Sequence, residues 1–547
     1  MRALTLALLV AFVVASQAYT ESNELNKSPR EIVAESDLMS DQYDVVVFIG
    51  DSYENLPASL SSIADAISAY VKINPGAGSA MSVIPYSVHP SRKLIWASTG
   101  DLSSDIASSR KLRQTGENAM RRVHNLGFQR VLLVIGPLMT AHHSFDWAFG
   151  DYPKMSAALG GLHYLFKPLQ VREMVGPEAK VDKLGLYDFS PKLLKFVEAV
   201  GEGMGVLRDI GDSDPERTAP PKIVEYIEAR RPDWEAAGIS LTVEDVIQMK
   251  DKYPMAYAVN RATIPNPNHH GKVVTAVYTP KSNTPITETI ILVGKGVALD
   301  TGGADLKTEG GMYGMHNDKL GAAFVAGFFH TLSLLKPEGV KVIGYMPYIR
   351  NSIGKYAYLP DEIITLVNGL RVRIGDTDAE GRNIMSDVLY YAKEQAKKET
   401  NPHIFTIATL TGAASRSFGP YTVVMDNGPA EDVKMAQKMM ACGDRIGDPA
   451  EVSRIRYEDF TPNMGNSEFI DIHQYNPYGG TSKRGHSFAM GFLSMASQID
   501  KHGRNSGIPI PYTHCDIAGS GGGINELATA APLRMFSLRF LWSRTKE

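Results

Sequence analysis

Short apolar runs alternate with longer amphipathic stretches along most of this chain. In its first part, the runs at 44–49, 93–97 and 131–135 have the length and apolar content of buried strands. The stretches at 60–71 and 105–126 carry apolar residues at helical spacing. Strands that alternate with helices predict an α/β domain with a largely parallel sheet.

The same alternation returns after a break near the middle of the chain. Residues 191–210 predict one long helix, which Gly211 and the pair Pro220-Pro221 bring to an end. Beyond it we expect strands at 273–278, 289–293, 340–346, 404–409 and 512–517, and helices at 320–335, 384–396, 433–442 and 488–498. The predicted organisation is an N-terminal α/β domain at 43–190, a connecting helix at 191–211 and a second domain at 212–547.

The first 42 residues have a different pattern. An apolar run at 4–15 is followed by Ser16-Gln17-Ala18, which places small residues where signal peptidase would cleave before Tyr19. We expect residues 1–18 to be a signal peptide, with a short membrane anchor as the alternative, and the mature chain to be secreted or to enter the secretory-pathway lumen without a membrane anchor. Residues 19–42 are polar and aperiodic, which predicts a flexible lead-in.

Composition narrows the class of protein. The chain has 547 residues, enough for two cores, and its 56 Lys and Arg residues are balanced by 60 Asp and Glu residues, so no nucleic-acid partner is indicated. Its two cysteines, Cys442 and Cys515, exclude a disulfide framework. Cys515 is interpreted as a buried thiol, because no activating base accompanies it in its motif.

Two stretches rich in Gly, Asp and basic residues carry the candidate chemistry. One follows the strand at 289–293 and extends to Lys307, and the other is 376–382. If the second stretch is extended, Asp376, Asp378 and Glu380 point to one side, where solvent or a cation must balance their charge. Open α/β sheets bind ligands at the carboxyl ends of their strands. We therefore expect a metal site there.

Four carboxylates are candidates for this site: Asp300, Asp318, Asp378 and Glu380. Their four negative charges match two divalent cations, and hard oxygen ligands suit Zn²⁺, Mn²⁺ or Mg²⁺. Two such ions about 3.5–4 Å apart activate a water for attack on a carbonyl or phosphoryl group. A phosphoryl-transfer enzyme is therefore an alternative, but a Gly-rich loop leading to Lys-Ser or Lys-Thr is missing.

Several of these residues have two interpretations. Lys295 would ligate a metal only as a neutral amine, and would otherwise balance the acids. Asp318 is either a ligand or the N-cap of the helix that starts at Leu320. Lys307 and Arg382 are interpreted as cations that hold developing negative charge or an anionic cofactor. The alternative is that both are plain surface charge.

Taken together with their spacing, these stretches resemble the leucyl aminopeptidase family of bimetallic exopeptidases, also called cytosol aminopeptidases. The resemblance covers the second domain, with matching segments at 293–307, 315–323, 378–382, 409–413 and 514–519. It implies a smaller N-terminal α/β domain and a larger catalytic α/β/α domain with a mixed central sheet, usually assembled as a homo-hexamer. It also implies a metal-dependent aminopeptidase that removes N-terminal residues from peptides with a water activated by two metal ions.

The resemblance assigns a role to each matching residue. The metal ligands would be Lys295, Asp300, Asp318, Asp378 and Glu380, with Asp300 and Glu380 as bridges. Lys307 would polarise the scissile carbonyl, and Arg382 would hold a bicarbonate ion that serves as general base. The substrate-pocket positions would be Met315, Thr409, Leu410 and Gly412.

The chain also departs from the family pattern. Asp376 stands where the family usually has Asn, Lys319-Leu320 follows Asp318 in place of Met and a small residue, and Cys515 lies beside His514. These departures bear on substrate preference and rate. The alternative function is therefore a secreted, catalytically weak homologue with a binding or structural role.

Overall fold

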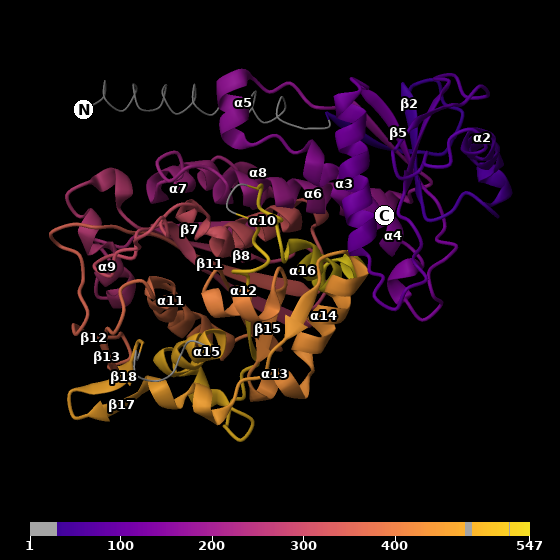
Figure 1. The fold of residues 1–547 in the computed structure, drawn as a ribbon. Helices are drawn as coiled ribbons and strands as arrows, with labels where there is room; N and C mark the ends of the chain where they lie inside the picture. Colours follow the sequence, from indigo (N-terminus) through magenta and orange to yellow (C-terminus); the bar gives the residue numbers. More distant parts are fainter. Residues whose placement is uncertain (1–29, 476–483, 524–525) are drawn as a thin grey trace. The chain divides into compact units, whose positions relative to one another are not determined.

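The computed structural model describes residues 30–475, 484–523 and 526–547 (Figure 1). The predicted signal peptide at 1–18 and residues 19–29 of the predicted lead-in lie outside the described residues. The chain forms two compact units. The first consists of residues up to Gly201 together with Asp444–Asp448, and the second of Glu202–Gly443 and Pro449–Lys546. The division falls within helix α6 (Pro191–Gly211).

The first unit is built on a six-stranded sheet. Its strands, in spatial order, are β1 (Glu31–Glu35), β6 (Lys183–Tyr187), β5 (Arg130–Ile135), β2 (Val45–Gly50), β4 (Lys93–Ser98) and β3 (Val83–Pro85). Only β3 runs antiparallel to its neighbour. The main helices are α2 (Ser61–Val71), α3 (Arg110–Asn125) and α4 (Tyr152–Leu165). Helices α3 and α4 approach so closely that a Cβ on Gly116 would lie 2.0 Å from the Ala157 carbonyl oxygen, so these two helices require glycine at their contact.

Strand β1 overturns part of the predicted lead-in. Residues Glu31–Glu35 pair in parallel with β6, a strand that the sequence patterns did not predict. The local sequence of β1 is half polar, which suits an edge strand, and its hydrogen-bond partner lies about 150 residues away in the chain. A strand held by such a distant partner has no local signal, so the prediction of a flexible lead-in is wrong for residues 31–35.

The second unit is built on a nine-stranded mixed sheet. Its strands, in spatial order, are β16 (Ala450–Val452), β15 (Thr422–Asp426), β19 (Tyr512–Asp516), β14 (Pro402–Ala408), β9 (Glu288–Gly294), β11 (Val340–Asn351), β8 (Lys272–Tyr278) and β7 (Ile239–Asp245), with β10 (Gly296–Asp300) also paired to β11. The central strands β19, β14, β9 and β11 are parallel. Strands β15 and β8 run antiparallel to these neighbours. The predicted mixed central sheet is confirmed.

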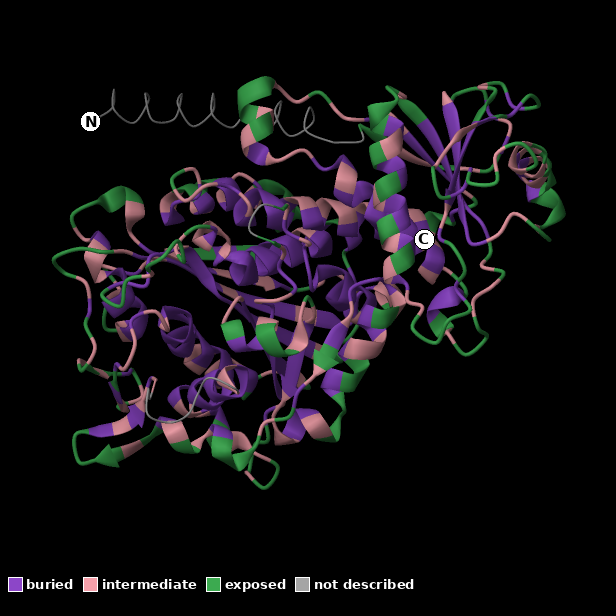
Figure 2. Cartoon of the chain, viewed as in Figure 1, coloured by how far each residue is buried: buried purple, intermediate pink, exposed green. Residues whose placement is uncertain are grey.

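Helices cover both faces of this sheet, which explains why its central strands β9 and β14 are buried at every position after the first residue (Figures 1 and 2). Helices α10 (Leu320–Leu335) and α16 (Leu533–Phe540) pack on one face. Helices α9 (Pro254–Asn260), α11 (Glu380–Ala396) and α15 (Gly485–Ala496) pack on the other, around a large apolar cluster. A buried parallel sheet between two helical layers is the α/β/α arrangement that the alternating pattern favours.

A small sheet of four strands completes the second unit. Its order is β12 (Ile363–Thr365), β13 (Arg371–Arg373), β18 (Ile470–His473) and β17 (Met464–Ser467). Among the helices that the structure describes, none is long and apolar enough to cross a membrane.

Candidate functional site

The candidate residues gather where the central strands end. Strand β9 ends at Gly294, Lys295 follows it, and Asp300 is the last residue of β10. Asp318 lies two residues before α10, and Glu380 is the first residue of α11. Because β9, β11 and β14 are parallel, their carboxyl ends meet at one edge of the sheet. Side chains from distant stretches of the chain therefore meet at this edge.

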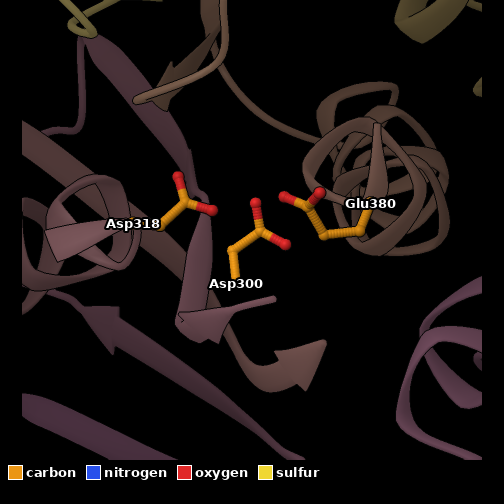
Figure 3. A group of neighbouring side chains, drawn as sticks. All are labelled: Asp300, Asp318 and Glu380. Carbon is orange, nitrogen blue, oxygen red and sulfur yellow. The ribbon is translucent and has the colours of Figure 1, made fainter. Parts of the chain in front are cut away.

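Three carboxylates point toward one another at this edge (Figure 3). Asp300, Asp318 and Glu380 each offer an oxygen, and these atoms lie within 4.8 Å of one another. All three residues are buried. Like charges that are removed from water repel strongly unless cations neutralise them, so this arrangement requires positive charge close by.

Lys295 supplies part of that charge. Its Nζ lies 2.7 Å from Asp318 Oδ1 and 2.9 Å from Glu380 Oε1, and it donates a hydrogen bond of 3.0 Å to the Thr409 carbonyl oxygen. Burial alone would lower the pKa of Lys295, but the carboxylates of Asp318, Glu380 and Asp300 raise it above its usual value. A Cβ on Gly381 would lie 2.3 Å from the lysine Cε, so glycine at this position leaves room for the lysine side chain.

Asp318 is not the N-cap of α10. The cap position is Lys319, and no side chain accepts a capping hydrogen bond there. Asp318 Oδ1 instead accepts a hydrogen bond of 2.8 Å from Thr409 Oγ1, besides its ion pair with Lys295. The capping alternative for Asp318 is therefore wrong.

Lys307 joins Asp378 to the same cluster. Its Nζ lies 2.8 Å from Asp300 Oδ2 and also forms an ion pair with Asp378. Burial and the nearby charge of Asp300 raise the pKa of Asp378 to about 7, against the opposing effect of Lys307. Lys307 is thus a partner of the acids and not plain surface charge.

The carboxylates keep acceptor capacity that the protein does not use. Within the described residues, Asp318 Oδ2 and Glu380 Oε2 are buried and accept no hydrogen bond. Burial, and then the charge of Asp300, raise the pKa of Glu380 well above its usual value. Buried acceptors without donors are costly. Oxygen ligands that lack protein donors fit divalent cations, which prefer this donor type.

The segment from Asp376 to Ala379 is a turn, so the condition that it is extended does not hold. The Ala379 amide donates to the Asp376 carbonyl oxygen, and α11 starts at the next residue. Gln474 holds this turn, because its Nε2 donates to the carbonyl oxygens of Asp376 at 2.7 Å and Ala379 at 3.0 Å. Gln474 is 98 residues from Asp376 in the chain, so sequence reasoning missed it.

Arg382 lies on the first turn of α11 and is buried. Its Nη1 donates to the Gln474 carbonyl oxygen at 3.3 Å, and its guanidinium lies 5.8 Å from the centre of the Tyr475 ring. Burial lowers the pKa of Arg382 from its usual value, against the opposing effect of Asp376. Arg382 is thus a buried cation, and the surface-charge alternative is wrong.

A cavity of about 190 Å³ lies beside the cluster. Six of the sequence-predicted site residues line it. They are Lys295, Asp378, Glu380 and Arg382 and, from the predicted substrate pocket, Leu410 and Gly412. Met315 and Thr409 are not among the described lining residues, although Thr409 contacts Asp318 and Lys295. The cavity also has lining residues that the sequence did not indicate, namely Arg416, Asn463 and Phe488.

Strand β19 carries His514 and Cys515, both of which are buried. His514 lies fully buried in β19, and its Nδ1 is 2.7 Å from Thr406 Oγ1. Cys515 and Cys442 are buried free thiols, and burial raises the pKa of Cys515 above its usual value. The buried position of Cys515 agrees with the buried thiol expected from the sequence.

Fold and site together define an α/β enzyme with a centre for divalent metal ions. The family model described as "Cytosol aminopeptidase family, catalytic domain" matches residues 206–537. A Caenorhabditis elegans protein, provisionally named as an aminopeptidase, is 38% identical over 517 residues, covering 92% of this chain and 96% of the relative. A Chlorobaculum tepidum protein, provisionally named as a cytosol aminopeptidase, is 34% identical over 264 residues, 47% of each chain.

A solved structure of similar fold is the bottromycin maturation enzyme BotP in complex with Mn, with a TM-score of 0.69 and 21% identity. The match covers 91% of this chain and all of that one. The chain belongs to the cytosol aminopeptidase family, and it is accordingly a metallo-aminopeptidase, which confirms the resemblance seen in its sequence.

Proposed function

We propose that this chain removes N-terminal residues from peptides with two divalent metal ions, held by Lys295, Asp300, Asp318, Asp378 and Glu380. The observation that carries this proposal is the buried group of three carboxylates, two of which keep an oxygen that no described donor satisfies. When bound, two such ions supply an activated water and an anchor for the free α-amino group of the substrate. The anchor would restrict cleavage to the first residue.

The residues of the chain supply the remaining parts of the reaction. Lys307 extends its ammonium group between Asp300 and Asp378, where a donated hydrogen bond would stabilise negative charge on the scissile carbonyl oxygen. Arg382 faces the cavity from the first turn of α11 and would hold an anion there, for which bicarbonate is our proposal. Lys295 must lose a proton before it acts as a ligand, so its two ion pairs would be replaced on metal binding.

The metal is proposed to be Mn²⁺ or Zn²⁺, with Mg²⁺ as a weaker candidate. The solved structure of BotP is described as a complex with Mn. An amine ligand such as Lys295 is softer than a carboxylate and favours Zn²⁺ and Mn²⁺ over Mg²⁺.

We also propose a homo-hexamer, from the family resemblance, and a secreted chain cleaved before Tyr19, from the signal-peptide pattern. Light scattering of the purified chain and the N-terminal sequence of the exported chain test these two points.

The activity is tested by incubating the metal-loaded chain with aminoacyl-amides and dipeptides, each with a free and with an acetylated N-terminus. We expect metal-dependent release of the first residue from free substrates only. The double variant Asp378→Ala, Glu380→Ala should lose this activity. A folded, metal-loaded chain without turnover would contradict the proposal and favour the catalytically weak homologue, for which the acidic Asp376 in the cavity wall would be the first residue to replace.

A further inference from the structure

Arg416 is a cavity-lining residue that none of the roles above uses. It lies on α12 (Gly412–Phe418), four residues after Gly412, and therefore on the same face of the helix. A Cβ on Gly412 would lie 2.8 Å from Arg416 Nη1 and 3.5 Å from its Cζ. The guanidinium group thus lies directly against Gly412, a predicted substrate-pocket position, and the missing side chain gives it room.

The other cations of the cavity already have partners. Lys295 pairs with Asp318 and Glu380, and Arg382 donates to a backbone carbonyl group. Arg416 is exposed, and no described residue forms a hydrogen bond or an ion pair with it. Arg416 therefore offers a bound molecule five donors that no described residue uses, in addition to Arg382, which is already assigned to the bicarbonate ion.

The wall near Arg416 also leaves space for a substrate side chain. Gly412, Ala413 and Gly485 line the cavity, and a Cβ on Gly485 would already lie 3.1 Å from the Ala413 Cβ. These small residues form a narrow, neutral wall beside the guanidinium group. Of the acids that line the cavity, Asp378 and Glu380 belong to the proposed metal site, where the metal charge would offset them, and Asp376 lies outside that ligand set.

We propose that Arg416 is a specificity-determining residue that binds a carboxylate of the substrate, so that this site favours acidic peptides. The inference rests on the proposed function, because it concerns the substrate of the same site. A planar guanidinium group binds a carboxylate through two parallel hydrogen bonds, which discriminates an acid from the amide of the same shape. The carboxylate has three sources: the side chain of the first residue, the side chain of the second, or the terminal carboxyl group of a dipeptide.

Paired substrates that differ only in charge separate these sources. The first pair is the 7-amido-4-methylcoumarin derivatives of Glu and Gln, the second is Leu-Glu-amide and Leu-Gln-amide, and the third is Leu-Gly and Leu-Gly-amide. The selectivity for the acid within each pair is measured as a ratio of kcat/KM for wild type, Arg416→Gln and Arg416→Glu. Lys398→Gln is the matched control, because it removes one exposed positive charge that does not line the cavity.

We expect Arg416→Gln to lower the acid selectivity of one pair by about tenfold, and Arg416→Glu to lower it further, with no change in Lys398→Gln. The affected pair identifies the source of the carboxylate. Unchanged selectivity in all three pairs would overturn the inference. If wild type turns over no substrate, the proposed function fails. Calorimetric binding of glutamate and of glutamine then tests Arg416 independently. Tighter binding of glutamate that Arg416→Gln loses supports the inference, and equal binding of the two amino acids overturns it.

Discussion

Each of the two units has acidic side chains near the carboxyl ends of its central strands, and these acids have different roles in the two units. In the first unit, Asp51 follows β2 and accepts hydrogen bonds from the Met139 amide at 2.9 Å and from the Thr140 amide at 2.6 Å and hydroxyl group at 2.7 Å. In the second, Asp318 and Glu380 each keep a buried oxygen that no described donor reaches. The comparison indicates that unused acceptor capacity, and not position alone, distinguishes a binding site from a structural turn.

The largest expected effect on catalysis is that of replacing Glu380. Glu380→Gln keeps the shape of the side chain but removes the charge that would hold metal, so we expect kcat/KM for a free aminoacyl-amide to fall by about 10³-fold or more. Steady-state kinetics at saturating Mn²⁺ measures the loss. The matched control is Glu468→Gln, an exposed residue outside the cavity, which should retain wild-type rates. Comparable activity in both variants would remove Glu380 from the mechanism.

A smaller effect is expected for Lys307→Met. The variant loses the proposed hydrogen bond to the carbonyl oxygen, and kcat should fall by about 10²–10³-fold while bound metal persists. Kinetics together with metal analysis of the same sample checks this. Lys250→Met, an exposed lysine outside the cavity, is the control. Loss of metal in Lys307→Met would instead indicate that Lys307 holds the acidic side chains in place for metal binding.

Metal affinity should depend on pH through Asp378. Its pKa is raised to about 7, so the metal-free folded chain keeps this carboxyl group protonated at pH 6 and must release the proton to bind metal. As pH falls below 7, the Asp378 proton should therefore weaken affinity for Mn²⁺ by about tenfold per unit, in addition to the dependence that comes from the Lys295 proton. The same raised pKa favours the metal-free fold at low pH, and this contribution disappears as pH rises through 7. Calorimetric titration from pH 8 to 6 should show a shallower dependence in Asp378→Asn.

The smallest effect on catalysis is expected for a substitution of Asp51, the structural aspartate of the first unit. Asp51→Ala leaves the partly buried donors of Met139 and Thr140 without an acceptor, which should lower the free energy of unfolding by about 1–2 kcal/mol. The kcat/KM of the folded fraction should not change. Thermal unfolding and kinetics on one preparation test both statements. A drop in kcat/KM without a lower melting temperature would give the first unit a role in the reaction.

Much of the fold was predictable because its signals are local. The bounds of α10 agree with the predicted 320–335, and the apolar run of β9 gave the strand that leads to Lys295. Strands β1 and β6 escaped prediction, since β1 is half polar and Gly185 interrupts β6, where a Cβ would lie 2.3 Å from the Tyr43 hydroxyl oxygen. Their pairing depends on contacts that are distant in the chain.

The residues of the candidate site also differ in whether a local sequence signal indicates them. The acids and lysines stand close together in two stretches of the sequence, so their types and spacing indicated them. Gln474 and Arg416 carry no such pattern, and only the fold places them against the 376–382 segment and the cavity. The sequence also left Asp318 open between a cap and a ligand, which the contact with Thr409 decides against the cap.

The most direct test of the central claim is the number of metal ions that each chain holds. Native mass spectrometry of the Mn²⁺-loaded protein, supported by elemental analysis, should find two ions per chain in wild type and in Asp51→Ala. It should find none, or one weakly held ion, in the Asp378→Ala, Glu380→Ala double variant. A wild-type chain that holds no metal, or a double variant that keeps both ions, would contradict the account.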